Sequence, residues 1–160
     1  MLTRLFRAAR RNRLEFLLEI IPSKVGPVDD ATTADLIRRI YELGIFPDWW
    51  KLEPQRTRRA WEAACATITD CDPHTRGIVM LGLDAPEEEL AESFQIAAGF
   101  PLVKGFAVGR TIFGQVARDW LAGRIGDEAA VQAMAERYQR LCVVWDAARL
   151  RTNAREEALS

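Results

Sequence analysis

The chain has 160 residues, of which 49% are hydrophobic, and its formal net charge is -1. This length suits one domain with a substantial core, and this hydrophobic fraction argues against disorder. A charge so close to zero gives no general attraction for nucleic acid or a membrane surface, so any anion-binding site must be local. No apolar run is long enough to span a membrane.

The cysteines predict reduced thiols and a cytoplasmic protein. Cys65, Cys71 and Cys142 are odd in number and form no CxxC pair, which argues against a disulfide framework or a closed zinc site. Cys71 and His74 have the spacing of metal ligands, but the sequence has no second ligand pair and no other histidine. We therefore expect no metal site.

The first element expected along the chain is a basic helix. Leu2, Leu5, Phe6 and Ala9 recur at helical spacing and are surrounded by arginines. The lack of acids before Glu15 gives this segment a faint likeness to a transit peptide or a basic arm. The apolar stripe makes a structural helix the better interpretation.

Four short apolar segments are predicted to be strands, near residues 14–21, 47–53, 77–83 and 103–108. Amphipathic helices are expected at residues 31–43, 55–68, 86–98, 111–121 and 127–148. We expect residues 1–148 to form a single domain and residues 149–160 to be a polar, frayed tail.

This alternation of strands and helices implies right-handed βαβ units and a parallel sheet. A doubly wound open sheet is one possibility, but the chain has no GxGxxG or Walker fingerprint to support it. The other is a (β/α) barrel of the TIM-barrel type, which takes about 250 residues when complete. Four units would then be an α/β half-barrel, corresponding to strands five to eight.

An open half-barrel exposes two strand edges and an apolar inner face. We therefore expect a partner that covers them. The candidates are a second copy of the chain, a separately encoded N-terminal half-barrel, or the remainder of a longer polypeptide.

The string DWWKLEP places Lys51 inside a segment that otherwise predicts a buried strand. Side-chain alternation puts Trp50 and Leu52 on one face, and Lys51 on the other with Trp49 and Glu53. Desolvation disfavours the charged form of an amine, and a neutral amine can attack a carbonyl carbon to form a Schiff base. The alternative is an ordinary ion pair between Lys51 and Glu53 on the solvent-facing side of the strand.

Four strings in the predicted strands resemble strands five to eight of class I aldolase barrels, in the group of tagatose-bisphosphate and sulfofructosephosphate aldolases. They are LLEII, DWWKLEP, MLGLD and GFAVGR. Over essentially the whole chain, the sequence resembles the aldolase-like C-terminal domain that is fused to 5-dehydro-2-deoxygluconokinase in bacterial inositol catabolism. The DWWKLEP string is the most specific part of this likeness.

The resemblance implies a role for each of four residues. Lys51 falls on the Schiff-base lysine, and Glu19 falls on the proton-transfer glutamate of strand five. Gly109 and Arg110 fall on the pair that helps to hold a substrate phosphate. In each case a purely structural role is the alternative: Glu19 neutralising a nearby cation, and Arg110 pairing with a carboxylate.

Strand seven departs from the pattern of the group. Gly82 stands where those aldolases have a serine, and its backbone amide can still reach a phosphate. Asp84, which follows, would repel one. Lys104 on the last predicted strand is as plausible an ion-pair partner for a glutamate as Lys51 is.

The activity implied by the resemblance is a lyase reaction of myo-inositol catabolism. The substrate would be 2-deoxy-5-keto-D-gluconate 6-phosphate, cleaved to dihydroxyacetone phosphate and malonate semialdehyde. No metal or other cofactor is implied, because the iminium serves as the electron sink, and no nucleic acid or membrane is implied as a partner. A linked or separate kinase is a further candidate partner. The alternative function is that of a non-catalytic, fragmentary assembly module that lacks the N-terminal half of the barrel.

Overall fold

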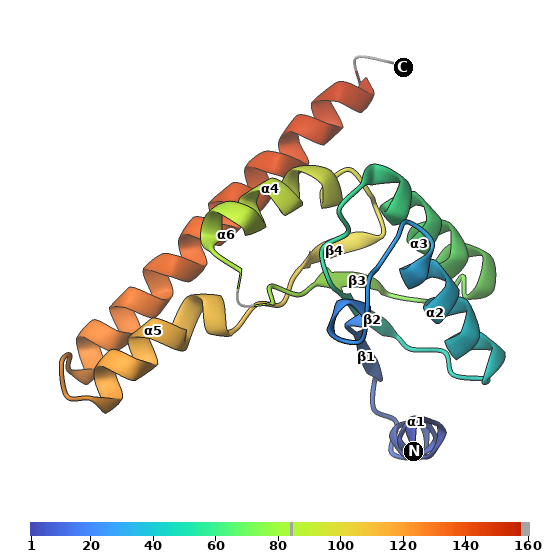
Figure 1. The fold of residues 1–160 in the computed structure, drawn as a ribbon, viewed down its shortest axis with the longest axis horizontal. Helices are drawn as coiled ribbons and strands as arrows, with labels where there is room; N and C mark the ends of the chain where they lie inside the picture. Colours follow the sequence, from blue (N-terminus) through green and yellow to red (C-terminus); the bar gives the residue numbers. More distant parts are fainter. Residues whose placement is uncertain (84, 158–160) are drawn as a thin grey trace.

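The computed structural model describes residues 1–83 and 85–157 and alternates strands with helices after an initial helix (Figure 1). The expectation about Asp84 lies outside the described residues. In chain order the elements are α1 (Leu2–Arg11), β1 (Leu17–Ile20), the 3-10 helix η1 (Pro22–Lys24), α2 (Thr32–Glu42), β2 (Trp49–Leu52), α3 (Arg58–Cys71), β3 (Gly77–Met80), α4 (Glu87–Ala97), β4 (Val103–Phe106), α5 (Arg110–Leu121) and α6 (Asp127–Glu157).

The sheet is parallel throughout, and its strands lie in the order β1-β2-β3-β4 within the described part of the chain. Strands that are consecutive in sequence are thus neighbours in space, as in a barrel that winds in one direction. This confirms the predicted fold class, four parallel strands of a half-barrel. Each strand is shorter than expected and has four residues.

The helices cover one face of the sheet and form a single hydrophobic core with it. Trp50, Leu52, Ile78 and Met80 are fully buried on this face. They belong to one cluster with side chains from four helices: Ile37 and Tyr41 of α2, Trp61, Ala64 and Ile68 of α3, Leu90, Phe94 and Ala97 of α4, and Leu141, Trp145 and Ala148 of α6. Period-2 alternation explains why these strand residues are buried, while those between them are not.

The other face of the sheet is open. Leu17 is 48% exposed on β1, and the β2 residues Trp49 and Lys51 are only half-buried. In a closed barrel this face would be the interior, filled by layers of side chains. The fold is therefore half of a barrel whose inner face is uncovered in this chain.

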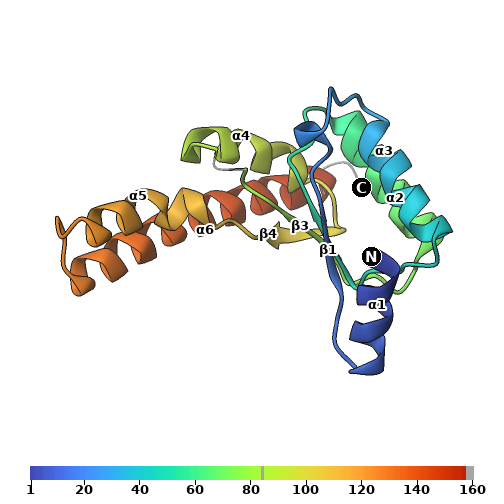
Figure 2. The same cartoon turned by 60° about the horizontal axis from the view of Figure 1, so that its bottom comes forward.

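The predicted N-terminal helix is present as α1, which lies at the start of β1 (Figures 1 and 2). Phe6 packs edge-on against Phe16 with ring centroids 5.5 Å apart. Arg10 forms an ion pair of 2.8 Å with Asp48, at the start of β2. These contacts attach the basic helix to the N-terminal end of the sheet.

The third helix begins later than predicted. Thr57 caps α3 by accepting a hydrogen bond from the amide of Ala60 at 3.0 Å, and the helix runs to Cys71 instead of ending at residue 68. Gln55, which was expected to begin the helix, is buried and donates to the carbonyl of Glu53 at 2.7 Å. A threonine side chain at the N-cap explains the observed start.

The prediction of a frayed tail from residue 149 is wrong for the residues that the structure describes. α6 continues beyond Ala148 to Glu157 and runs alongside α4 and α5 (Figures 1 and 2). Arg149 donates to the carbonyl of Ala98 at 3.0 Å, and Arg151 donates to Gln95 at 2.7 Å. These tertiary contacts hold the polar segment in helical form. No described helix, α6 included, has the length and apolar character needed to cross a membrane.

Candidate active site

A cavity of about 380 Å³ lies at the C-terminal end of the sheet, where barrel enzymes place their active sites. Strand ends and the loops that follow β1, β3 and β4 contribute its walls. All five residues singled out from the sequence line it: Glu19, Lys51, Gly82, Gly109 and Arg110. The structure therefore brings the predicted set together in one place.

Lys51 and Glu19 form the polar centre of this cavity. They lie opposite one another on the neighbouring parallel strands β2 and β1, so both side chains project from the open face of the sheet. The Nζ atom of Lys51 is 2.9 Å from Oε1 of Glu19, and the two side chains are 26% and 42% exposed. At this distance a proton can pass directly between the amine and the carboxylate.

The alternative ion pair between Lys51 and Glu53 is wrong. The side chain of Glu53 is buried, and its carboxylate accepts hydrogen bonds from the amide of Ser23, at 3.1 Å, and from the Ser23 hydroxyl. β2 ends at Leu52, so the alternation that would have placed Glu53 beside Lys51 no longer holds there.

Lys104 does not take the place of Lys51. Its ammonium donates to the carbonyl of Pro101 at 2.8 Å, and it does not line the cavity. In the part of the chain that the structure describes, Lys104 forms no ion pair with a glutamate.

The wall opposite β1 is built from backbone at the end of β3 and the start of α5. Gly109 is the N-cap of α5 and supplies no side-chain cap, and it lines the cavity together with Arg110 and Thr111 from the first turn of that helix. Gly82 packs closely here, since a Cβ at this position would lie 2.7 Å from Cγ1 of Val108. A wall of backbone amides with Arg110 beside them has the chemistry of an anion site.

Several cavity residues were not singled out from the sequence, and Lys24, Thr111 and Phe113 are three of them. Lys24 comes from η1, just after β1, and Thr111 and Phe113 come from the first turn of α5. Their position soon after the C-terminal ends of strands was the one available signal, because all such ends meet at the same edge of a parallel sheet. Thr111 also donates its hydroxyl hydrogen to the carbonyl of Ala85 at 3.1 Å, which fixes the start of α5.

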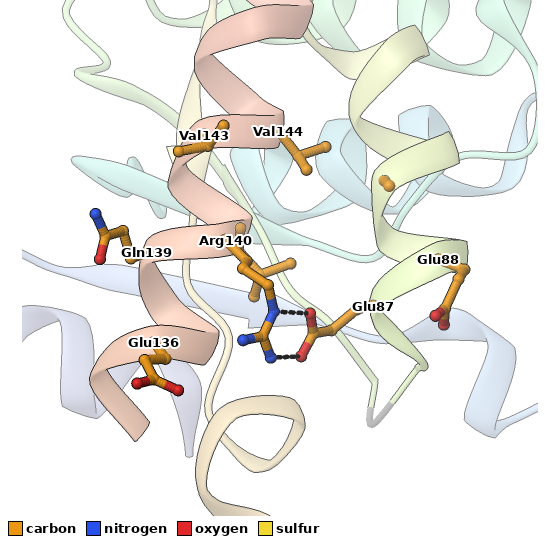
Figure 3. Close-up of a pocket in the computed structure, with 9 residues that line it drawn as sticks. Glu87, Glu88, Glu136, Gln139, Arg140, Val143 and Val144 are labelled. Atoms are coloured by element: carbon orange, nitrogen blue, oxygen red, sulfur yellow. Dashed lines mark hydrogen bonds and ion pairs between the residues drawn. The ribbon is translucent and has the colours of Figure 1, made fainter. Parts of the chain in front are cut away.

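A second and larger hollow, of about 590 Å³, lies between α4 and α6 (Figure 3). At one end Arg140 forms a two-pronged ion pair with Glu87, at 2.9 and 3.0 Å, which lowers the pKa of the Glu87 carboxyl. Val143 and Val144 line another part of it. None of the residues singled out from the sequence lies here, and its lining contains no lysine, so it offers no amine for imine chemistry.

The fold and site together define an α/β half-barrel similar to part of an aldolase barrel. A solved structure of fructose-bisphosphate aldolase from Plasmodium falciparum, in complex with TRAP and a small-molecule inhibitor, matches this chain with a TM-score of 0.58 and 19% sequence identity. The match covers 88% of this chain and 46% of that chain, so the present chain spans less than half the length of the aldolase. At this identity the likeness shows the fold.

The chain belongs to a family described as an uncharacterized protein conserved in bacteria, DUF2090, whose model matches residues 1–149. No curated protein matches the sequence.

Proposed function

We propose that this chain carries the Schiff-base site of a class I aldolase. The observation that supports it most strongly is the 2.9 Å contact between the Lys51 amine and the Glu19 carboxylate, inside a cavity at the C-terminal end of a parallel sheet. An amine, an adjacent proton acceptor and a nearby anion-binding wall are the groups that imine chemistry on a phosphorylated ketone requires. The aldolase-like fold is consistent with this assignment.

In the proposed reaction, Glu19 takes a proton from Lys51, and the neutral amine attacks the ketone carbon of the substrate. A carbon-nitrogen bond forms and the ketone oxygen leaves as water, giving an iminium. Glu19, whose first proton has left with that water, then takes the proton of the hydroxyl on the carbon beta to the iminium, and this carbon becomes an aldehyde as its bond to the alpha carbon breaks. The bonding electron pair moves onto the iminium, and Glu19 returns a proton to the resulting enamine before hydrolysis frees Lys51.

The substrate that we favour is 2-deoxy-5-keto-D-gluconate 6-phosphate, on the basis of the sequence resemblance. Cleavage would give dihydroxyacetone phosphate and malonate semialdehyde, a step of myo-inositol catabolism. The phosphate would bind the amides near Gly82 and Gly109 and the guanidinium of Arg110, which line the same cavity as Lys51.

A second candidate function is a non-catalytic assembly module with an aldolase-like fold. The observation that favours it is the open inner face of the sheet, together with a match to only 46% of the aldolase chain. A site that stays open to water would lose much of the electrostatic advantage that a closed barrel provides.

Cleavage assays on single variants separate these two candidates. We expect the folded protein to release dihydroxyacetone phosphate from the proposed substrate, and Lys51→Arg to lower kcat/KM by at least about a thousandfold, since an arginine cannot supply a neutral amine. Arg110→Ala is expected to raise KM by roughly 10- to 100-fold by removing a charge-assisted contact. Lys104→Arg is the matched control and should stay within about twofold of the unmodified chain.

The Schiff-base proposal fails if cleavage survives Lys51→Arg but stops when metal ions are chelated. If the folded chain cleaves none of the substrate, the assembly module is the better explanation.

A further inference from the structure

We infer that two copies of this chain close edge to edge, with β4 of one copy beside β1 of the other, to form an eight-stranded barrel around the Lys51 site. This inference goes beyond the proposed function, because it concerns assembly and can be tested without any substrate.

The sheet has two unpaired edges. Over the described residues, β1 is hydrogen-bonded only to β2, and β4 only to β3. Each outer edge therefore presents a row of backbone groups that another parallel strand can satisfy. Eight strands close a barrel of this type, and two copies supply four each.

The two edges carry opposite charge on the open face of the sheet. At the β1 edge lie the carboxylates of Glu15 and Glu19, which ion-pair within the chain with Arg76 and Lys51 and whose side chains remain 50% and 42% exposed. At the β4 edge lies Lys104, an exposed cation that donates to a backbone carbonyl. The stem of Lys104 lies across Gly77 on the neighbouring strand, since a Cβ added there would be 2.7 Å from the Lys104 Cγ. Lys104 is thus held on the face that would become the barrel interior.

A second copy of this chain brings an edge of opposite charge to each edge of the first, which an unrelated partner need not do. In a twofold pair the acidic edge of each copy meets the basic edge of the other, so both junctions are the same and both are complementary. Closing the barrel would also bury Leu17 and the half-buried Trp49, and would give the charged group of Lys104 the carboxylate partner that burial requires. The interior side of the Lys51 cavity would then be covered by the second copy.

Sedimentation of the full chain at micromolar concentrations tests this assembly. We expect a species of twice the 18.1 kDa chain mass. Lys104→Glu would place a carboxylate against the acids of the partner copy, and we expect it to raise the dimer Kd by at least about tenfold. Arg59→Glu makes the same charge change on α3, on the helix-covered side of the sheet, and should leave the Kd unchanged.

A charge exchange makes the test specific for the β4-to-β1 junction. Glu19→Lys alone should also weaken the dimer, because it would face Lys104 of the partner. A mixture of the Lys104→Glu and Glu19→Lys chains should restore dimers, since every junction in the mixed pair again joins opposite charges. Circular dichroism of each variant establishes that it is folded before mixing.

A chain that remains a monomer, or that binds only a different half-barrel, overturns the inference. So does a dimer that Lys104→Glu and Arg59→Glu affect equally, or a mixture that fails to restore the dimer. None of these results depends on whether Lys51 forms an imine, so the proposed function and this assembly can fail separately.

Discussion

Asp48 shows how a single side chain attaches α1 and β1 to the second strand. Its carboxylate accepts a hydrogen bond from the amide of Phe16 at 2.7 Å and ion-pairs with Arg10 at 2.8 Å. Burial acts to raise the pKa of this carboxyl, but the hydrogen bonds from Phe16 and Arg10 outweigh it and lower the pKa. Asp48 therefore contributes stability that is present above the unfolded-state pKa of about 3.9 and is lost as the pH falls through the lower folded-state pKa.

Asp48→Asn should remove this pH-dependent contribution. We expect it to lower the free energy of unfolding by about 1 kcal/mol at pH 6, with a smaller difference from the unmodified chain near pH 3. Urea titrations at the two pH values measure this, with the exposed Asp146→Asn as a control. An equal deficit at both pH values would show that the carboxylate charge is not what matters.

The Lys51 and Glu19 pair shows which contacts between single residues the sequence pattern predicts. Alternation along the two strands and the resemblance to aldolases predicted residues that the structure brings within 2.9 Å. The same alternation failed for Glu53, because the strand ends at Leu52 and the carboxylate is held by Ser23 instead. Lys24 was missed because it lies in η1, a three-residue 3-10 helix that is too short for a periodic pattern to indicate which way a side chain points.

At the scale of whole elements, the sequence predicted the order of the strands and α-helices, since apolar strands alternate with amphipathic helices, but it did not predict η1. It did not predict where α6 ends. The polar composition after Ala148 suggested fraying, whereas Arg149 reaches the carbonyl of Ala98 and extends the helix along α4. Contacts between distant parts of the chain decide such an end, and a local pattern does not contain them.

α6 should therefore be integral to the core. Trp145 is buried and packs edge-on against Phe94 with ring centroids 5.3 Å apart. We expect Trp145→Ala to lower the free energy of unfolding by about 3–5 kcal/mol, since it removes a large buried ring. Val143→Ala, at an exposed position of the same helix, should cost far less. Urea unfolding at one fixed protein concentration makes the comparison, and similar costs for both variants would contradict a core role for α6.

At the scale of the whole molecule, the chain is half of a barrel that carries a lysine and a glutamate in contact toward the C-terminal end of its sheet. The helix-covered face supplies the core, and the open face holds the candidate site. A second copy, closing β4 against β1, would complete the barrel that such a site needs in order to exclude water.

The central claim, that Lys51 is a Schiff-base amine, is tested most directly by borohydride reduction in the presence of dihydroxyacetone phosphate, followed by peptide mass mapping. The sequence has three lysines, Lys24, Lys51 and Lys104, so the modified site can be assigned without ambiguity. We expect a covalent adduct on Lys51 alone, and none in the Lys51→Arg chain. An adduct on Lys24 or Lys104 instead, or no adduct on the folded and assembled protein, would contradict it.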